Sequence, residues 1–518
     1  MDTLRYFFED RIDATKEKVS VDVCVYGGTA AGVTAAVRAA AERRSVIVLH
    51  PGRVLGGMTT GGLSFTDIGN KTAIGGLARA FYRRLGERYG LAETFKFEPH
   101  VAQTELDAIV HQNAIDVRYY QYLDAVHVAH RRIHSITMLG GLEIEARAFI
   151  DATYEGDLMA KSGVTYTTGR ESNAAYGERY NGRQVHPTHQ FDCDVDPYVR
   201  VGVPESGLLP RVMPEREFIE GSGDRRIQAY NFRVCMTDDE SNRMPFPKPA
   251  SYDSAEYELA RRWLHCTRAN VFTKFDRITD TKTDTNNHGA VSTDFIGASY
   301  RWPEGDFRER ERIFQAHVTY QQGLHWFMAN DPGVPDDVRR EYARWGLAAD
   351  EFTETGGWPH QLYIREARRM ISEYVVSEHD CIGATRCEDS VGMAAYQMDS
   401  HNCARIVQNG VVKNDGDVQE TLPAPYPISF RSIVPSRGEI ENLVVPLCLS
   451  ASHIAFGSVR MEPVFMILAE SAAIVASIAL LRGSAVQDVP YDELAAELNR
   501  VGQVLYTDSS NTEPMNPD

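Results

Sequence analysis

Apolar and polar positions near the start of the chain predict a strand, a turn, a helix and a second strand. Residues Val21–Tyr26 alternate and then become continuously apolar, which is typical of a buried parallel strand. A helix of small residues is predicted over Val33–Arg43, and a second apolar strand over Ser45–Leu49. Strand, turn, helix and strand within about 30 residues predict a Rossmann-type βαβ unit.

The turn Gly27–Gly32 has the composition of a dinucleotide-binding turn. Gly27 permits a tight bend, a small residue at 29 lets the backbone approach a pyrophosphate, and Gly32 lets the helix pack closely on the strand. Thr29 replaces the usual second glycine, and His50 replaces the acidic residue that normally binds the ribose. A glycine-rich turn without a ligand is the alternative. The predicted cofactor contacts here are Gly27, Gly28, Thr29, Ala30, Ala31, Gly32 and His50.

A second glycine-rich segment, residues 51–62, follows the second strand directly. Beside a dinucleotide fold, such a segment lays backbone against the flavin and its phosphates, where side chains would collide; otherwise it is only a flexible loop. An NAD-binding domain does not need this segment, so FAD is the predicted cofactor. Gly56–Gly62 contains no histidine or cysteine, so the FAD is expected to be non-covalent. The predicted contacts are Pro51, Gly52, Arg53, Gly56, Gly57, Met58, Thr59, Thr60 and Gly61.

The stretches VYGGTAAG (25–32) and VLHPGRVLGGMTTGGLSFTDIG (48–69) resemble the start of an FAD-dependent oxidoreductase family sometimes described as xanthan lyase-like. Segments 228–233, 286–287, 292–297 and 356–369 carry the same resemblance, which covers roughly residues 20 to 482. It implies an α/β fold with an α+β cap, in which a Rossmann-type FAD-binding domain of glutathione-reductase-like architecture is interrupted by a substrate or cap domain.

The remaining elements fit this division. Helices are predicted over Thr104–Asn113, Asp253–Cys266 and Phe307–Met328, with alternating runs between residues 115 and 146. The predicted parts are an N-terminal extension (1–20), a first FAD-binding part (21–164), a substrate-binding or cap domain (165–385), a second FAD-binding part (386–482) and a C-terminal tail (483–518).

Three further segments are expected to reach the cofactor. The backbone of Val126 is a candidate contact for the adenine, and the buried strand Ala148–Thr153 should end beside the cofactor. A helix that begins near Pro463 would point its positive N-terminus at the flavin. Asp157 could instead cap a helix over Leu158–Ser162. The predicted contacts are Ala152, Thr153, Gly156, Asp157, Ser458, Met461, Glu462 and Pro463.

The catalytic candidates are His401, His453 and Arg365. A neutral imidazole can accept a hydroxyl proton while hydride leaves to flavin N5; a structural histidine is the alternative for each. Arg365, Arg368 and Arg369 are predicted on one helix, where they could orient a substrate or pair with acidic residues.

The predicted reaction is hydride transfer to flavin from a CH–OH carbon of a polar, sugar-like small molecule. One alternative is a fumarate reductase-like flavoprotein that forms or reduces a C=C bond, with Arg365 as proton donor. Another is a non-catalytic FAD-binding accessory protein. The sequence does not indicate the electron acceptor or the oligomeric state.

Composition narrows the partners and the location. The net charge of −18 opposes nucleic-acid binding. Eight cysteines without a CxxC pair predict no zinc site, and reduced cysteines are expected. The polar N-terminus does not resemble a signal peptide. The longest apolar run near the C-terminal end, Ala472–Leu481, is about half of the roughly 20 residues needed to span a bilayer. No membrane association and a cytoplasmic location are therefore expected.

Overall fold

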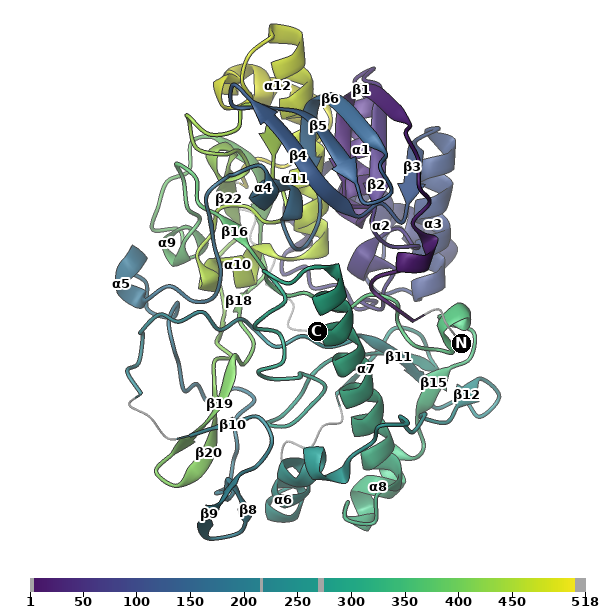
Figure 1. Cartoon of the computed structure of the whole chain (residues 1–518), viewed down its shortest axis with the longest axis vertical. Coiled ribbons are helices and arrows are strands. Elements are labelled where there is room, and N and C mark those ends of the chain that lie inside the picture. Colours follow the sequence, from purple (N-terminus) through teal and green to yellow (C-terminus); the bar gives the residue numbers. More distant parts are fainter. Residues whose placement is uncertain (1–3, 215–217, 269–273, 508–518) are drawn as a thin grey trace.

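The computed structural model describes residues 4–214, 218–268 and 274–507. Its largest sheet has the strand order β3-β2-β1-β6-β5-β4, and β23 pairs with β6 (Figure 1). Strands β1, β2, β3, β6 and β23 run parallel, whereas β4, β5 and β6 form an antiparallel meander. The strands are β1 (Lys18–Tyr26), β2 (Val46–His50), β3 (Asp116–Tyr119), β4 (Leu123–Ala129), β5 (Arg132–Met138), β6 (Glu143–Asp151) and β23 (Leu443–Val444).

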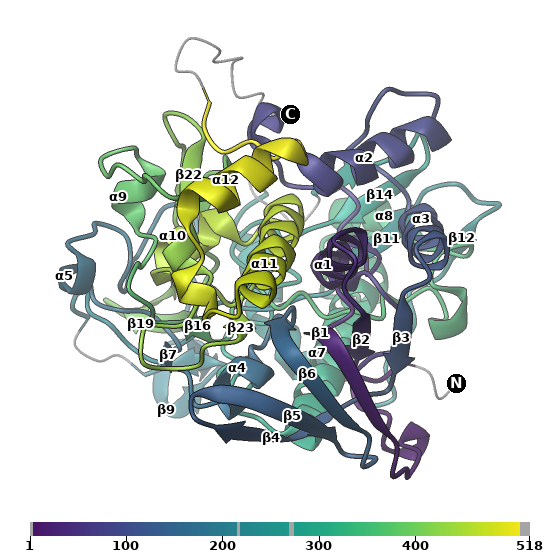
Figure 2. The ribbon, with the colours of Figure 1, turned by 90° about the horizontal axis from the view of Figure 1, so that it is seen from above.

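Helices cover one side of this sheet (Figure 2). The small side chains of α1 allow α11 to pack closely beside it, and both lie above the central strands. These helices are α1 (Ala30–Ala41), α2 (Gly76–Arg88), α3 (Pro99–Gln112), α11 (Glu462–Arg482) and α12 (Tyr491–Arg500). The strand–turn–helix–strand unit predicted from the apolar pattern is confirmed, as is the α/β fold class.

Helix α11 is longer than the apolar run in the sequence indicates. It has 21 residues and is, among the described residues, the one helix long and apolar enough to cross a membrane. The expectation that no segment reaches this length is wrong, because the helix begins ten residues before Ala472, at Glu462. Of its most apolar window, 94% is buried inside the protein. The apolar composition therefore serves the core between the helices and the main sheet.

A single strand, β6, is present where the apolar pattern predicts two separate strands. Residues 142–146 and 148–153 were expected as different elements, but Glu143–Asp151 is one strand. Strand β1 pairs with β6 along its whole length, but on the other edge the first half of β6, which alternates in burial, pairs with β5, and the fully buried second half pairs with β23. The change of pattern reflects a change of neighbours along a continuous strand.

The middle of the chain forms a second region below the main sheet, which we call the cap (Figure 1). Its sheet has the order β12-β15-β11-β14-β13, and the 24-residue helix α7 (Phe307–Asn330) runs beside it. The cap strands are β11 (Val234–Thr237), β12 (Arg243–Met244), β13 (Phe275–Arg277), β14 (Lys282–Thr285) and β15 (Gly346–Ala348), with helices α6 (Glu258–Cys266) and α8 (Asp336–Tyr342).

A three-stranded sheet joins the predicted cap domain (165–385) to the predicted second FAD-binding part (386–482). Strand β10 (Val212–Met213) pairs with β19 (Ala404–Gln408), which pairs with β20 (Val411–Asp415). Residues beyond 386 thus also pair with a cap strand. The shorter elements are α4 (Asp157–Lys161), α5 (Asn173–Tyr176), α9 (Glu378–Cys381), α10 (His453–Val459), β7 (Tyr166–Thr167), β8 (Tyr198–Arg200), β9 (Val203–Leu208), β16 (Arg369–Met370), β17 (Ser390–Ala394), β18 (Met398–Asp399), β21 (Gln419–Glu420) and β22 (Tyr426–Ser429).

One cysteine pair departs from the expectation of reduced thiols. Cys193 and Cys266 form a disulfide that joins a cap loop to the end of α6, across 73 residues of sequence. The other six cysteines are free and buried. Spacing alone could not reveal this pair, because the fold brings the two segments together.

Candidate functional site

The glycine turn after β1 leaves no room for side chains. Gly27 has a φ of +111°, and a Cβ there would lie 2.5 Å from the carbonyl oxygen of Ala152. A Cβ on Gly32 would lie 1.9 Å from the carbonyl oxygen of Gly27. Ala30 and Ala31 form the first turn of α1, so its N-terminal N–H groups face this turn. The geometry fits a dinucleotide pyrophosphate, which backbone can approach only where Cβ atoms are absent.

Thr29 has a structural reason to stand where a glycine is usual. It is the N-cap of α1, and its Oγ1 accepts a hydrogen bond from the Gly32 N–H at 3.1 Å. The same hydroxyl donates to the Ala152 carbonyl at 2.9 Å. Thr29 therefore ties the helix N-terminus to the end of β6, beside Thr153.

The second glycine-rich segment lies directly against the first. The Gly56 N–H donates to the Gly28 carbonyl at 2.8 Å, and Gly56 has a φ of +103°. Farther along, a Cβ on Gly61 would lie 2.3 Å from Cβ of Gln361, and a Cβ on Gly62 would lie 1.9 Å from the carbonyl oxygen of Arg233. The segment thus runs from the glycine turn to the cap.

A pocket opens between these two segments. Nine of the predicted cofactor residues line it, namely Gly27, Gly28, Thr29, His50, Pro51, Gly52, Arg53, Gly57 and Thr153. The remainder of the lining is Arg5, Tyr6, Phe8, Val54, Tyr154, Glu155, His360 and Gln361. No pattern in the sequence pointed to Arg5, Tyr6 and Phe8, which precede the first strand.

His50 stabilises the pocket rather than binding a ribose through its ring nitrogens. Its Nδ1 accepts from the Gly28 N–H at 3.1 Å, so its Nε2 carries the proton and donates to the Val54 carbonyl at 2.8 Å. Burial lowers the pKa of His50 to about 4, which keeps the ring neutral. Both nitrogens bind the protein, so the contact of an imidazole nitrogen with the ribose is not available in this arrangement.

Glu462 joins the inner end of the glycine segment to α11. Its carboxylate accepts from Thr59 Oγ1 at 2.6 Å and from the Tyr154 hydroxyl at 2.7 Å. The Tyr154 oxygen in turn accepts from the Met58 N–H at 2.9 Å. Burial raises the pKa of Glu462 to about 7. Thr60 turns inward and donates to the Leu55 carbonyl.

The N-terminus of α11 lies where the sequence predicts it. Met461 is the N-cap residue, and Pro463 lies in the first helical turn. Ser458, on the preceding helix α10, donates to the Tyr396 carbonyl at 2.5 Å. These residues are buried beside the Thr59–Glu462 contact rather than in the pocket lining.

Val126 and Asp157 do not line the pocket. Val126 lies on β4, three strands away from β1 in the sheet. Asp157 binds Arg310 and Arg368 at 2.5 and 2.8 Å. Burial alone would raise the pKa of Asp157, but these two guanidinium groups lower it to about 2. The alternative role of Asp157 as a helix cap is wrong, since Gly156, with a φ of +68°, is the N-cap of α4.

His401 and Arg365 converge on the carboxylate of Asp294. His401 Nδ1 lies 2.8 Å from Asp294 Oδ2, and Arg365 Nη1 lies 2.8 Å from Oδ1. On its other side, His401 Nε2 lies 3.7 Å from Asp399 Oδ2, and Arg460 Nη2 donates to the Asp399 carbonyl at 2.9 Å. These five residues, which we call the His401 cluster, are all buried.

The charges of the His401 cluster are mutually compensated. Burial would raise the pKa of Asp294, but Arg365 and His401 lower it to about 2. The pKa of Asp399 is likewise lowered, because His401 and Arg460 outweigh its burial. Both carboxylates are therefore ionised at neutral pH, and both face the imidazole of His401.

Each arginine around the cluster keeps one buried donor without a hydrogen-bond partner among the described residues. These donors are Arg365 Nε, Arg460 Nε and the Nη1 of Arg233. All three guanidinium groups lie over the ring of Tyr363, at 4.7, 5.7 and 5.9 Å from its centroid. Unsatisfied buried donors are costly in a folded protein, so they indicate a place for a polar ligand or water. Asp67, whose pKa is raised by burial, adds an acidic group beside Arg233.

The cluster lies next to the cofactor-binding elements. Arg460 immediately precedes Met461, the N-cap of α11, and Asp399 packs against Gly457 of α10. Gly62, at the end of the second glycine segment, contacts Arg233. Arg233 and Asp294 lie in segments that carry the family resemblance, but the sequence alone assigns no role to either residue. Asp399 and Arg460 were missed as functional residues, since no spacing in the chain relates them.

The prediction of a helix carrying Arg365, Arg368 and Arg369 is wrong. The segment is extended and ends in β16, which pairs with β7. Arg365 binds Asp294, Arg368 binds Asp157, and Arg369 binds Glu171 at 2.6 Å. Each side chain is buried against a different element, and these tertiary contacts override the local helical pattern.

His453 lies apart from His401 as an ion-pair partner at the start of α10. Its Nδ1 is 2.8 Å from Glu366 Oε2, and Glu366 also binds Arg369 at 3.1 Å. Burial opposes ionisation of Glu366, but His453 and Arg369 lower its pKa to about 2. The contacts of His453 are those of a structural residue.

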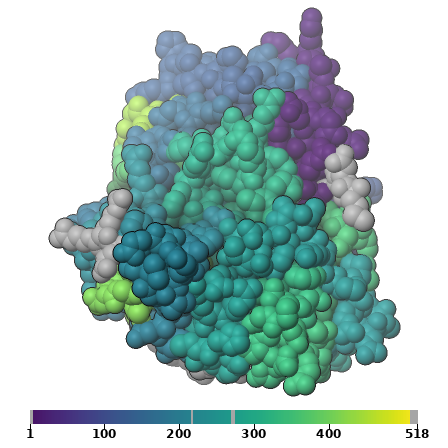
Figure 3. All heavy atoms as spheres, turned by 60° about the horizontal axis from the view of Figure 1, so that its bottom comes forward, coloured from purple at the N-terminus to yellow at the C-terminus, as the bar shows by residue number. Residues whose placement is uncertain are grey.

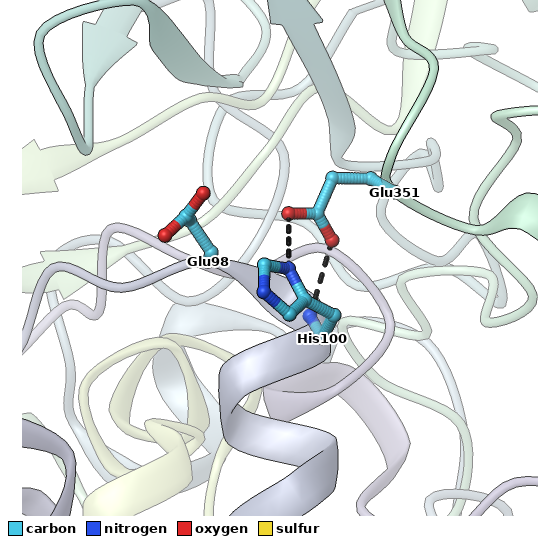
Figure 4. A group of neighbouring side chains, drawn as sticks. All are labelled: Glu98, His100 and Glu351. Atoms are coloured by element: carbon cyan, nitrogen blue, oxygen red, sulfur yellow. Dashed lines mark hydrogen bonds and ion pairs between the residues drawn. The ribbon is translucent and has the colours of Figure 1, made fainter. Parts of the chain in front are cut away.

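A separate acidic group near α3 has the spacing of a metal site. Glu98, His100 and Glu351 present ligand atoms within 4.8 Å of one another (Figure 4). The ammonium group of Lys282 lies 2.6 Å from Glu98 and 2.8 Å from Glu351, where a cation would otherwise be needed. We therefore interpret this group as an ion-pair network that ties α3 to the cap.

Comparisons with known proteins agree with this geometry. The model of the family described as FAD dependent oxidoreductase matches residues 22–498. Solved structures similar to part of the chain include a flavin-containing monooxygenase from Stenotrophomonas maltophilia (18% identity, 32% of this chain and 44% of that one, TM-score 0.21), THI4 from Thermovibrio ammonificans (18%, 29% and 66%, 0.23) and 3-ketosteroid-delta4-(5alpha)-dehydrogenase from Rhodococcus jostii RHA1 (15%, 31% and 51%, 0.21). The chain spans less than two thirds of each of these three structures, and no curated protein matches it. Because the family match covers nearly the whole chain and the glycine-rich pocket fits the cofactor, the chain belongs to the FAD dependent oxidoreductase family, with FAD as its cofactor.

Proposed function

We propose that this oxidoreductase oxidises a CH–OH carbon of a polar, sugar-like small molecule, with His401 as the catalytic base. FAD, when bound, accepts the hydride. The observation that supports the proposal is the position of His401 between two ionised carboxylates in a buried site beside the N-terminus of α11.

Asp294 favours the tautomer of neutral His401 that a base needs. The Nδ1–H of His401 donates to the Asp294 carboxylate, so the lone pair of Nε2 is left to accept the hydroxyl proton. After the transfer, the ring carries a positive charge. The Asp399 carboxylate, 3.7 Å from Nε2, stabilises that charge.

The arginines supply fixed donors for the other oxygen atoms of the substrate. The unpaired N–H groups of Arg365, Arg460 and Arg233 are held by buried carboxylate and carbonyl partners, so their directions are set before a substrate arrives. Donors fixed in this way favour a substrate with several hydroxyl or carboxylate oxygens and disfavour an apolar alcohol.

The cofactor is proposed to be non-covalent. The pocket lining contains no cysteine, and both nitrogens of His50 are bound to the protein, so His360, whose Nε2 has no hydrogen-bond partner among the described residues, is the lining histidine that attachment would use. Denaturation should release all of the FAD into the supernatant, and flavin that stays with the precipitated chain would contradict this assignment.

A second candidate is reduction of a C=C bond, with Arg365 as proton donor. The observation in its favour is that burial lowers the pKa of Arg365, although Asp294 opposes this effect. The two candidate reactions differ in the class of compound that exchanges electrons with the flavin. Purified holoenzyme is mixed anaerobically with sugars, hydroxy acids and unsaturated acids while the flavin absorbance is followed. We expect sugars or hydroxy acids to bleach the flavin. If none of them does, and unsaturated acids instead reoxidise chemically reduced enzyme, the first proposal is wrong.

A further inference from the structure

A segment of five residues, 4–8, precedes the first strand in the chain and lies against the cofactor pocket. We call them the N-terminal strap. Arg5, Tyr6 and Phe8 line the pocket together with the glycine turn and residues 50–54. The family match begins at residue 22, so the strap lies outside the matched range.

Backbone hydrogen bonds fix the strap to the cap and to the main sheet. The N–H groups of Tyr6 and Phe7 both donate to Glu311 Oε2 of α7, at 2.7 and 2.8 Å. The Phe8 N–H donates to the Tyr122 hydroxyl at 2.9 Å. Bonds to an ionised acceptor are stronger than neutral ones, so Glu311 is the main anchor.

The side chains of the strap are part of the core. The ring of Tyr6 packs on Trp302 with centroids 4.8 Å apart, and its hydroxyl donates to Glu155 at 3.2 Å. Phe7 packs on Tyr122 at 4.8 Å. In the space-filling view, the purple start of the chain lies against the teal-green cap (Figure 3).

A second, open depression adjoins the strap. Arg5 and Phe7 line this depression together with Glu9, Asp10, Arg308 and Glu311. The strap therefore separates the cofactor pocket from the surface. Arg5, which pairs with Asp10 at 3.0 Å, lines the pocket with Arg53 and adds positive charge beside the place of the FAD diphosphate, in a chain of net charge −18.

We propose that the N-terminal strap is a wall of the FAD site that retains the cofactor. Tyr6 and Phe8 cover the dinucleotide, and Arg5 favours its diphosphate. The anchor on α7 makes this wall depend on the cap, although the strap itself precedes the FAD-binding domain. The inference concerns the cofactor and does not depend on the reaction proposed above.

The decisive variant is Glu311→Ala in the full chain, because it removes the acceptor of two strap N–H groups from a half-buried surface position. The matched control is Glu309→Ala on the same helix, whose carboxylate pairs with Arg301 and Arg312. Titration of the apoproteins with FAD, followed by flavin fluorescence, should give a Kd about tenfold higher for Glu311→Ala and unchanged for Glu309→Ala.

A second measurement does not depend on any substitution. FAD should slow tryptic cleavage after Arg5 and Arg11 in the wild-type chain, because the bound cofactor holds the strap in place. A wild-type Kd for Glu311→Ala, an equal rise in Glu309→Ala, or cleavage at a rate independent of FAD would each overturn the proposal.

Discussion

The dinucleotide pocket and the His401 cluster lie close together but are built in opposite ways. About half of the pocket lining comes from two neighbouring segments, residues 27–29 and 50–57, in which glycines let the backbone come close. The cluster is made of side chains from segments around residues 294, 365, 400 and 460. A site that excludes side chains leaves glycines in the sequence, whereas a site assembled from side chains leaves no local pattern.

The largest effect is expected in the pocket. Gly32→Ala places a methyl group 1.9 Å from the Gly27 carbonyl oxygen, so the turn must open. Its N–H groups then no longer point at the pyrophosphate. We expect the Kd for FAD to rise at least about 100-fold. Ala41→Ser, at the exposed end of the same helix, is the control and should bind FAD normally. If Gly32→Ala binds as tightly as wild type, the turn does not hold the pyrophosphate.

A smaller effect, confined to chemistry, is expected in the cluster. Asp294→Asn removes the charge that orients His401 and leaves Arg365 without its carboxylate. Anaerobic flavin bleaching should slow by about 100-fold while FAD remains bound. Asp276→Asn on β13, whose carboxylate lies near Lys274, should bleach at the wild-type rate. Loss of FAD from Asp294→Asn would show that the two sites are not separate.

The smallest effect concerns Glu462, in the first turn of α11. Folding raises the pKa of this carboxyl from 4.5 to about 7, so the folded state holds the proton more tightly. The resulting stability is fully present below about pH 4.5 and is lost as the pH rises to about 7. Between pH 4.5 and 8, wild type should lose up to about 3 kcal/mol more free energy of unfolding than Glu462→Gln. Urea unfolding at several pH values measures this difference, and parallel curves for the two proteins would contradict it.

The apolar pattern predicts the Rossmann unit because its strands and first helix are decided by local burial. The same pattern divides β6 and misses its continuity, since burial there depends on whether β5 or β23 lies beside it. The helix predicted at Arg365–Arg369 does not form for a related reason. Each of the three arginines binds a carboxylate on a different segment of the chain.

The candidate site shows the same limit. Nine of the predicted cofactor residues line the pocket, and the glycines among them could be recognised in the sequence because a Cβ has no room there. Val126 does not line the pocket, since its distance from β1 follows from the strand order of the meander. Residue type identified His401 and Arg365 as candidates, but their shared partner Asp294 lies 107 residues from His401 in the chain.

Cofactor binding by the glycines and proton transfer by His401 can be tested together in one measurement. Purified His401→Gln is scanned for its flavin content and then mixed anaerobically with the best CH–OH donor of the wild-type enzyme. We expect a full complement of FAD and bleaching slowed by about 100-fold or more. Bleaching at the wild-type rate, or a variant that cannot hold FAD, would contradict the account.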